Sequence, residues 1–197
     1  MGLPNDQVVG VDALLNNRFD LSTLKRQPPV VVYDDDHYYL ASVLAEKIVT
    51  AGLECTYITP SPLVASWTTQ TLEQSRIQAR LLTLGVNVIT NHRLSDIEEG
   101  MCHLCCVYTD RIIEQPLQAL IPVTARVPND GLWQSLQDKK EQWQAAGISG
   151  IKSLGDCYAP GLIAAAVHAG HAYGRSVALD EAPQLMREDS LFKNSLS

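Results

Sequence analysis

The sequence predicts an α/β fold, a Rossmann-like three-layer sandwich with a central, mainly parallel sheet. Short apolar runs of strand length alternate with amphipathic helical patterns, and the spacing between them is short. Such alternation favours parallel strands joined by helices, with both faces of the sheet covered. The length of 197 residues is enough for one such domain and part of a second.

The first β-α-β unit lies at the start of this pattern. Val30–Tyr33 is continuously apolar, as expected for a strand that is buried on both faces. A helix is predicted from about Tyr38 to Thr50, and Gly52 fits the left-handed position that follows a helix. A second strand is predicted over Cys55–Thr59. The apolar residues that recur at helical spacing are Leu40, Val43, Leu44 and Ile48.

The same alternation continues to residue 180. The helix after the second strand has an apolar side formed by Leu72, Ile77, Leu81 and Leu84. Further elements follow, with helices expected over residues 71–85, 132–147 and 159–180 and strands over 86–90, 101–110, 117–128 and 149–156.

The turn between the first strand and helix reads "YDDDHYYLAS" and contains no glycine. A dinucleotide-binding turn needs glycines, because the backbone must approach the pyrophosphate closely. Asp34, Asp35 and Asp36 would instead repel a diphosphate. We interpret them as a solvated turn with a helix N-cap, and a divalent metal site is the alternative.

Four blocks occur in order between about Val30 and Arg175: "VVVYDDDHYYLASVLAEKIVTAG", "SWTTQTLEQSRIQARLLTLGVNVITN", "VTARVPND" and "GIKSLGDCYAPGLIAAAVHAGHAYGR". Together they resemble the C-terminal region of the trimethylamine, dimethylamine and histamine dehydrogenases and the 2,4-dienoyl-CoA reductase-like flavoproteins. The resemblance implies a TIM barrel with FMN and a [4Fe–4S] cluster elsewhere in the parent enzyme. It also implies two Rossmann-like domains of the FAD/NAD(P)-binding type, one nested in the other.

This resemblance implies a division of the chain. Residues 1–29 would be a connecting segment, 30–147 a degenerate NAD(P)-binding-like domain, 148–182 the returning end of an FAD/ADP-binding-type domain, and 183–197 a loose tail. We expect a nucleotide-binding-like portion of an oxidoreductase that is inactive without its barrel domain or a partner subunit. The alternative is a standalone FAD/NAD(P)-binding oxidoreductase domain with a remodelled phosphate turn. Homo-oligomerisation through the uncovered interface is a further expectation.

One cofactor-binding segment is implied by the resemblance. "GDCYAP" matches the family's G-D-x-x-A-P, so Gly155, Asp156, Ala159 and Pro160 are the candidate residues for FAD or ADP. Asp156 would bind the ribityl or ribose hydroxyls, and the helix that starts near Pro160 would face the phosphates. The alternative is a simple strand-to-helix turn. No catalytic residue is carried over.

Several other functions are disfavoured. The net charge of −7 argues against nucleic acid and anionic membrane surfaces, and neither a membrane-spanning run nor a signal peptide is evident. We therefore expect a cytoplasmic protein with reduced thiols. Cys102 and Cys105 of "CHLCC" are interpreted as buried thiols rather than zinc ligands, since strand residues three apart point to opposite faces. His168 and His171 are expected at a surface or interface, and Trp67 as a packing anchor.

Overall fold

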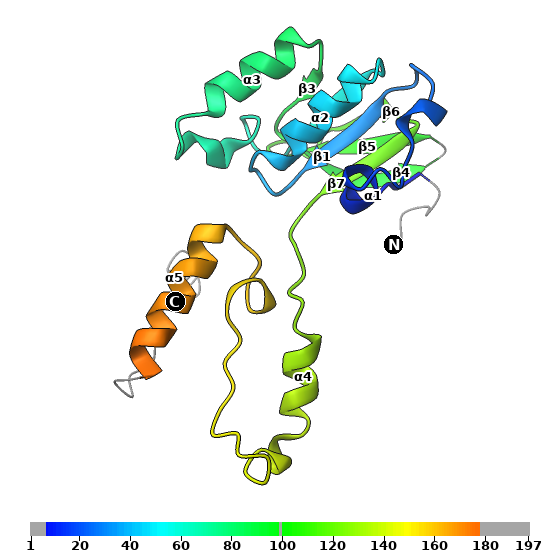
Figure 1. The fold of residues 1–197 in the computed structure, drawn as a ribbon. Coiled ribbons are helices and arrows are strands. Elements are labelled where there is room, and N and C mark those ends of the chain that lie inside the picture. Colours follow the sequence, from blue (N-terminus) through cyan, green and yellow to red (C-terminus); the bar gives the residue numbers. More distant parts are fainter. Residues whose placement is uncertain (1–6, 99, 178–197) are drawn as a thin grey trace. The chain divides into compact units, whose positions relative to one another are not determined.

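A computed structural model describes residues 7–98 and 100–177. The chain divides into two compact units, Met1–Ala125 and Arg126–Ser197 (Figure 1). The predicted division after residue 147 stays a prediction about the parent fold, because compactness does not reveal which ancestral domain a segment comes from.

The first unit is built on a four-stranded parallel sheet. Its strands are β1 (Val30–Asp34), β2 (Cys55–Ile58), β3 (Asn87–Ile89) and β7 (Ala119–Val123), in the spatial order β3-β2-β1-β7. The two central strands are formed almost wholly by buried residues. Because β2 and β7 pair with opposite sides of β1, the chain reverses its direction of travel across the sheet at β1.

Helices cover one face of this sheet. They are α1 (Val11–Leu15), α2 (Leu40–Thr50) and α3 (Gln74–Thr83), with 3-10 turns at Leu21–Thr23 and Ser66–Thr69. Gly52 has a φ of +84° directly after α2, which confirms the predicted left-handed position. The main apolar core, which includes Leu44, Ile48, Val30, Val32, Tyr57 and Leu81, lies between the helices and the sheet.

An antiparallel sheet covers the other face. It comprises β4 (His92–Glu98), β5 (Met101–Cys106) and β6 (Ile112–Pro116), in that spatial order. Val31 of β1 belongs to a second apolar cluster together with Cys102 and Leu104 of β5. Successive residues of β1 thus point to the two outer layers in turn. The predicted three-layer α/β sandwich with a central parallel sheet is confirmed, although the sequence did not indicate β4 or β6.

The outer edge of β7 is covered by the N-terminal segment. The Val9 amide donates to the Leu120 carbonyl over 2.8 Å, and the Leu120 amide donates to the Gln7 carbonyl over 2.8 Å. These bonds satisfy backbone groups that an open edge strand would leave unpaired. Residues 7–9 therefore extend the sheet beyond β7.

In its described residues, 126–177, the second unit contains little regular structure besides two helices. They are α4 (Gly131–Gln137) and α5 (Ile163–Val177), with 3-10 turns at Lys140–Gln142 and Gly155–Cys157. Two sequence predictions are wrong here. The helix expected over 132–147 ends at Gln137, and a 3-10 turn follows at Lys140–Gln142. No residue of α4 is buried, so packing against a core does not stabilise a longer helix. The strand expected over 149–156 does not form, since no described strand pairs with it.

The predicted tail over 183–197 lies outside the described residues, and so does the end of the helix expected over 159–180. Among the residues that the structure describes, no helix combines the length and the apolar character that crossing a bilayer requires.

Candidate functional site

The candidate site is the turn that joins β1 to α2 at the carboxyl edge of the parallel sheet. In open α/β sheets, ligands bind outside the carboxyl ends of the strands, where the strand order reverses. Here that position is the end of β1, since β2 and β7 flank it on opposite sides. The turn comprises residues 34–39.

Asp34 is completely buried at the start of this turn. The Tyr57 hydroxyl donates to its Oδ2, and the His37 amide donates to its Oδ1 over 2.9 Å. Burial raises the pKa of the Asp34 carboxyl above its usual value of 3.8, and the bonds from Tyr57 and His37 oppose that shift. Tyr57 is buried as well, and the pKa of its hydroxyl is strongly raised by burial and then by the charge of Asp34. The interpretation of Asp34 as a solvated residue is wrong, because β1 continues through this position and pairs with Val123.

The backbone of the turn is closed by hydrogen bonds within the protein. The amides of Asp35 and Asp36 both donate to the Val123 carbonyl, over 2.8 and 3.2 Å, and the amide of His37 donates to Asp34. These are the N–H groups that a phosphate-binding turn would direct at its ligand. The expected aspartate N-cap is also absent, since Tyr39 occupies that position. Three consecutive backbone amides therefore already donate hydrogen bonds within the protein.

The loop after β2 is fastened to this turn. The Trp67 amide donates to the His37 carbonyl over 2.9 Å, and the Ala65 amide donates to the Tyr57 hydroxyl over 3.3 Å. The His37 ring lies between the Thr59 hydroxyl, 3.4 Å from Nδ1, and a carboxylate oxygen of Asp35, 3.6 Å from Nε2. The Trp67 side chain itself is 59% exposed, so the prediction of a packing anchor is wrong. The backbone of Trp67 fixes the loop, and its indole faces solvent.

The residues predicted from "GDCYAP" lie in one tight turn of the second unit. Gly155 has a φ of +62°, its carbonyl accepts a 2.9 Å bond from the Ala159 amide, and a Cβ at this position would lie 3.4 Å from the Cβ of Ala166 in α5. Asp156 is exposed, and its Oδ1 accepts a 3.3 Å bond from the Gly161 amide. Pro160 precedes α5 and does not enter its first turn. Cofactor binding at Gly155, Asp156, Ala159 and Pro160 stays a prediction.

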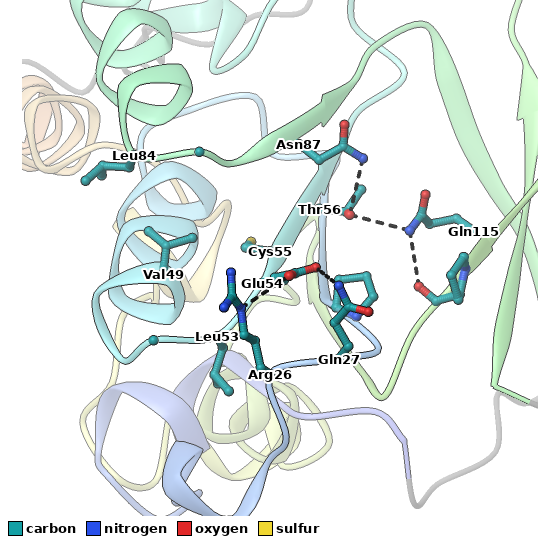
Figure 2. A pocket seen from close by; sticks show the side chains of 14 residues that line it. Arg26, Gln27, Val49, Leu53, Glu54, Cys55, Thr56, Leu84, Asn87 and Gln115 are labelled. Carbon is teal, nitrogen blue, oxygen red and sulfur yellow. Dashed lines mark hydrogen bonds and ion pairs between the residues drawn. The ribbon is translucent and has the colours of Figure 1, made fainter.

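A separate hollow of about 760 Å³ opens at the opposite, amino edge of the parallel sheet (Figure 2). Its wall includes an ion pair between Arg26 and Glu54 at 3.3 Å. Figure 2 also shows the buried Thr56 hydroxyl between the amide groups of Asn87 and Gln115, at 3.4 and 3.5 Å. The sequence gives no indication of this hollow, because its lining residues come from four segments that lie far apart in the chain. It lies away from the strand ends where α/β sheets bind cofactors.

The metal alternatives find no support in the geometry. Within residues 7–98 and 100–177, no three His, Cys, Asp or Glu side chains are grouped closely enough to hold a metal ion. The Cys102 thiol donates to the Gln115 carbonyl over 3.2 Å, and burial raises its pKa to about 11. Cys105 is also buried, which confirms the interpretation of both as buried thiols. His168 and His171 are exposed on α5, as predicted.

Comparison with known proteins identifies the relatives. Residues 23–117 match the family model of the OYE-like second alpha/beta domain. Dimethylamine dehydrogenase from Hyphomicrobium sp. (strain x) is 29% identical over 166 residues, which is 75% of this chain and 22% of that protein.

Two solved structures are similar to most of this chain. Histamine dehydrogenase from Rhizobium sp. 4-9 superimposes with a TM-score of 0.83 at 34% identity, over 96% of this chain and 28% of that chain. The 6-hydroxypseudooxynicotine amine oxidase HisD from Pseudomonas geniculata N1 superimposes with a TM-score of 0.76 at 26% identity, over 87% and 25% respectively. The chain thus spans 22% to 28% of the length of these three relatives.

Proposed function

We propose that this chain, whose residues 23–117 belong to the OYE-like second alpha/beta domain family, serves as the non-catalytic α/β portion of an amine-dehydrogenase-type flavoprotein. The parent activity, with FMN and an iron–sulfur cluster in a barrel domain, would be supplied by a further domain or a partner subunit. The chain is similar to roughly a quarter of each relative, which supports a partial contribution to a larger enzyme.

The closed turn at the end of β1 carries this proposal. A nicotinamide dinucleotide would need the amides of Asp35, Asp36 and His37, and all three already donate within the protein. The carboxylates of Asp35 and Asp36 would also face the diphosphate. Each like-charge pair at about 4 Å costs about 1–4 kcal/mol near a surface. A helix N-terminus offers an anion only about 0.3–1 kcal/mol in return. The parallel-sheet unit therefore acts through its fold and its surface, not as an NAD(P)H site.

The turn at Gly155–Asp156 contributes one half of an ADP or FAD site in this proposal. The exposed carboxylate of Asp156 can accept a ribose or ribityl hydroxyl, and the left-handed Gly155 holds that carboxylate beside α5. The glycine-rich turn that would complete the site has no counterpart in the 197 residues. We therefore expect weak binding of ADP by this chain and tight binding only in the complete enzyme.

The test is a calorimetric titration of the chain with NADH, NADPH, ADP and FAD. We expect no saturable binding of NADH or NADPH. We expect weak binding of ADP that is reduced in Asp156→Asn and unchanged in Asp35→Asn. The Asn variant keeps the acceptor for the Gly161 amide, so the substitution removes the charge of Asp156 and retains this hydrogen bond. Micromolar binding of NADH or NADPH with shifted amide resonances of Asp35 and Asp36 would contradict the proposal, and so would stoichiometric flavin with amine oxidation by the chain alone.

A further inference from the structure

An exposed apolar face lies beside the closed turn and is not explained by the proposed function. We call it the Trp67 face and define it by the side chains of Tyr39, Trp67 and Leu72, which are 52%, 59% and 87% exposed. The hydrogen bond from the Trp67 amide to the His37 carbonyl places Trp67 next to the turn that carries Tyr39. Leu72 adjoins Glu73, and Glu73 lines the same groove between α2 and α3 as Tyr39.

The backbone around this face is held in an uncommon conformation. His37, Ala65 and Leu72 have φ values of +60°, +47° and +62°, although none of them is glycine. Such conformations are rare, above all for a bulky residue such as leucine, and they cluster at functional sites. Two of these residues bracket the loop that exposes Trp67. The loop that carries the exposed Trp67 indole is thus held in a conformation that residues other than glycine rarely adopt.

The charges near the Trp67 face are mainly negative. The turn that carries Tyr39 contributes the carboxylates of Asp35 and Asp36, and the Asp35 carboxylate lies 3.6 Å from the His37 ring. The groove contributes the carboxylate of Glu73 and the guanidinium of Arg76. The other guanidinium that lines the groove, from Arg80, is paired with Glu46 at 2.7 Å. Phosphate-bearing ligands would be repelled here, and a cationic group would be attracted.

We propose that the Trp67 face binds a basic, arginine-containing segment of a partner polypeptide. A guanidinium can stack on the Trp67 indole while its charge lies near the Asp35 carboxylate, and its aliphatic stem can contact Leu72. Trp, Tyr and Arg are the residues that most often carry the binding energy of protein interfaces. This proposal does not depend on whether the chain binds a nucleotide.

The test uses the full chain and an acetylated, amidated peptide of alternating Arg and Ala. Binding is measured by calorimetry and by the indole N–H resonance of Trp67. Trp67→Ala and Asp35→Asn are each expected to weaken binding about two- to five-fold, the range that follows from one exposed cation–π contact or one surface ion pair. Trp67→Tyr should restore most of the loss. The exposed indole makes few packing contacts, so these variants are expected to fold.

Matched controls separate a specific site from general attraction to an acidic protein. Glu141→Gln removes one carboxylate from the second unit and Tyr108→Ala removes an exposed aromatic side chain from the β5–β6 turn, and neither should change the affinity. A peptide of alternating Glu and Ala should not bind. The proposal fails if Glu141→Gln weakens binding as much as Asp35→Asn, if Trp67→Ala binds normally, or if methylguanidinium alone binds as tightly as the peptide. NADH binding has a separate readout, so either proposal can fail without the other.

Discussion

Asp34 has a structural role at the end of β1. A buried carboxyl without hydrogen-bond partners would destabilise the fold. The Tyr57 hydroxyl and the His37 amide each donate a hydrogen bond to one of the two Asp34 oxygens. The same contacts fasten the turn to β2. These hydrogen bonds therefore hold the acidic turn in one conformation, at the position where related folds leave room for a phosphate.

The burial of Asp34 predicts an unusual dependence of stability on pH. The folded-state pKa of Asp34 is raised above 3.8. The folded state thus retains the proton to a higher pH than the unfolded state, and the stabilisation is complete below pH 3.8. It is lost as the pH rises through the folded-state pKa, at up to about 1.4 kcal/mol per pH unit.

Urea unfolding at several pH values measures this effect in the wild type and in Asp34→Asn. Relative to the wild type, Asp34→Asn should gain stability as the pH rises from below 4 toward neutrality. Asp35→Asn, which removes a half-exposed carboxylate from the same turn, should follow the wild type. An Asp34→Asn variant whose free energy of unfolding stays parallel to that of the wild type would show that Asp34 titrates normally.

At the scale of single elements, α2 shows what the sequence pattern can and cannot predict. Apolar residues at three- and four-residue spacing correctly predicted the helix and the burial of Leu44 and Ile48. The same pattern included Val43, which is 48% exposed. Periodicity identifies an apolar stripe, but the neighbouring elements decide how wide a stripe is covered.

This difference within α2 predicts two unequal mutations. Leu44 is fully buried in the main core, so Leu44→Ala should lower the free energy of unfolding by about 2–5 kcal/mol. Val43→Ala removes an exposed side chain one position away and should change it by about 0.5 kcal/mol or less. Chemical denaturation of both variants checks the orientation of the helix. Equal losses would mean that α2 is rotated from the position described.

The strands also differ in how well a local sequence pattern predicts them. β1, β2 and β7 were predictable because their residues are mostly buried on both faces, and such strands are largely apolar. β4 and β6 have one face toward solvent and alternate between exposed and partly buried residues, a weaker pattern over only 5 to 7 residues. The run at 149–156 has strand-like composition, yet a strand also needs a neighbour, and local sequence does not supply one.

The candidate site was predictable only as far as its chemistry is local. The missing glycines and the three aspartates of the turn are visible in the sequence and already argue against a diphosphate. The burial of Asp34 depends on Tyr57, 23 residues away, and the closure of the turn depends on Val123. The exposure of Trp67 depends on a loop with two left-handed residues, Ala65 and Leu72, that no composition rule indicates. Long-range partners decided the burial of Asp34 and the closure of the turn, and the backbone conformation of the loop decided the exposure of Trp67.

At the scale of the whole molecule, the two units differ in how much apolar surface they bury. Both apolar clusters consist of residues before position 126. Among the described residues of the second unit, only Ala169 and Ser176 are buried, while Leu162, Ile163 and Val167 of the α5 region are exposed. A segment with so little buried surface cannot offset the conformational entropy of folding.

We therefore predict that residues 1–125 fold cooperatively by themselves, with a free energy of unfolding within about 1 kcal/mol of the full chain, whereas residues 126–197 do not. The first fragment should give dispersed amide resonances and a single urea transition, since every large buried side chain of the two cores is present in it. The second should give the narrow dispersion of an unfolded chain, because its described apolar residues form no core of their own. Leu44→Ala in the short fragment is the control, and it should lower the free energy of unfolding by about 2–5 kcal/mol, as in the full chain. A short fragment that fails to fold would mean that the sandwich needs residues after Ala125, and a folded second fragment would mean that α4 and α5 form a core of their own.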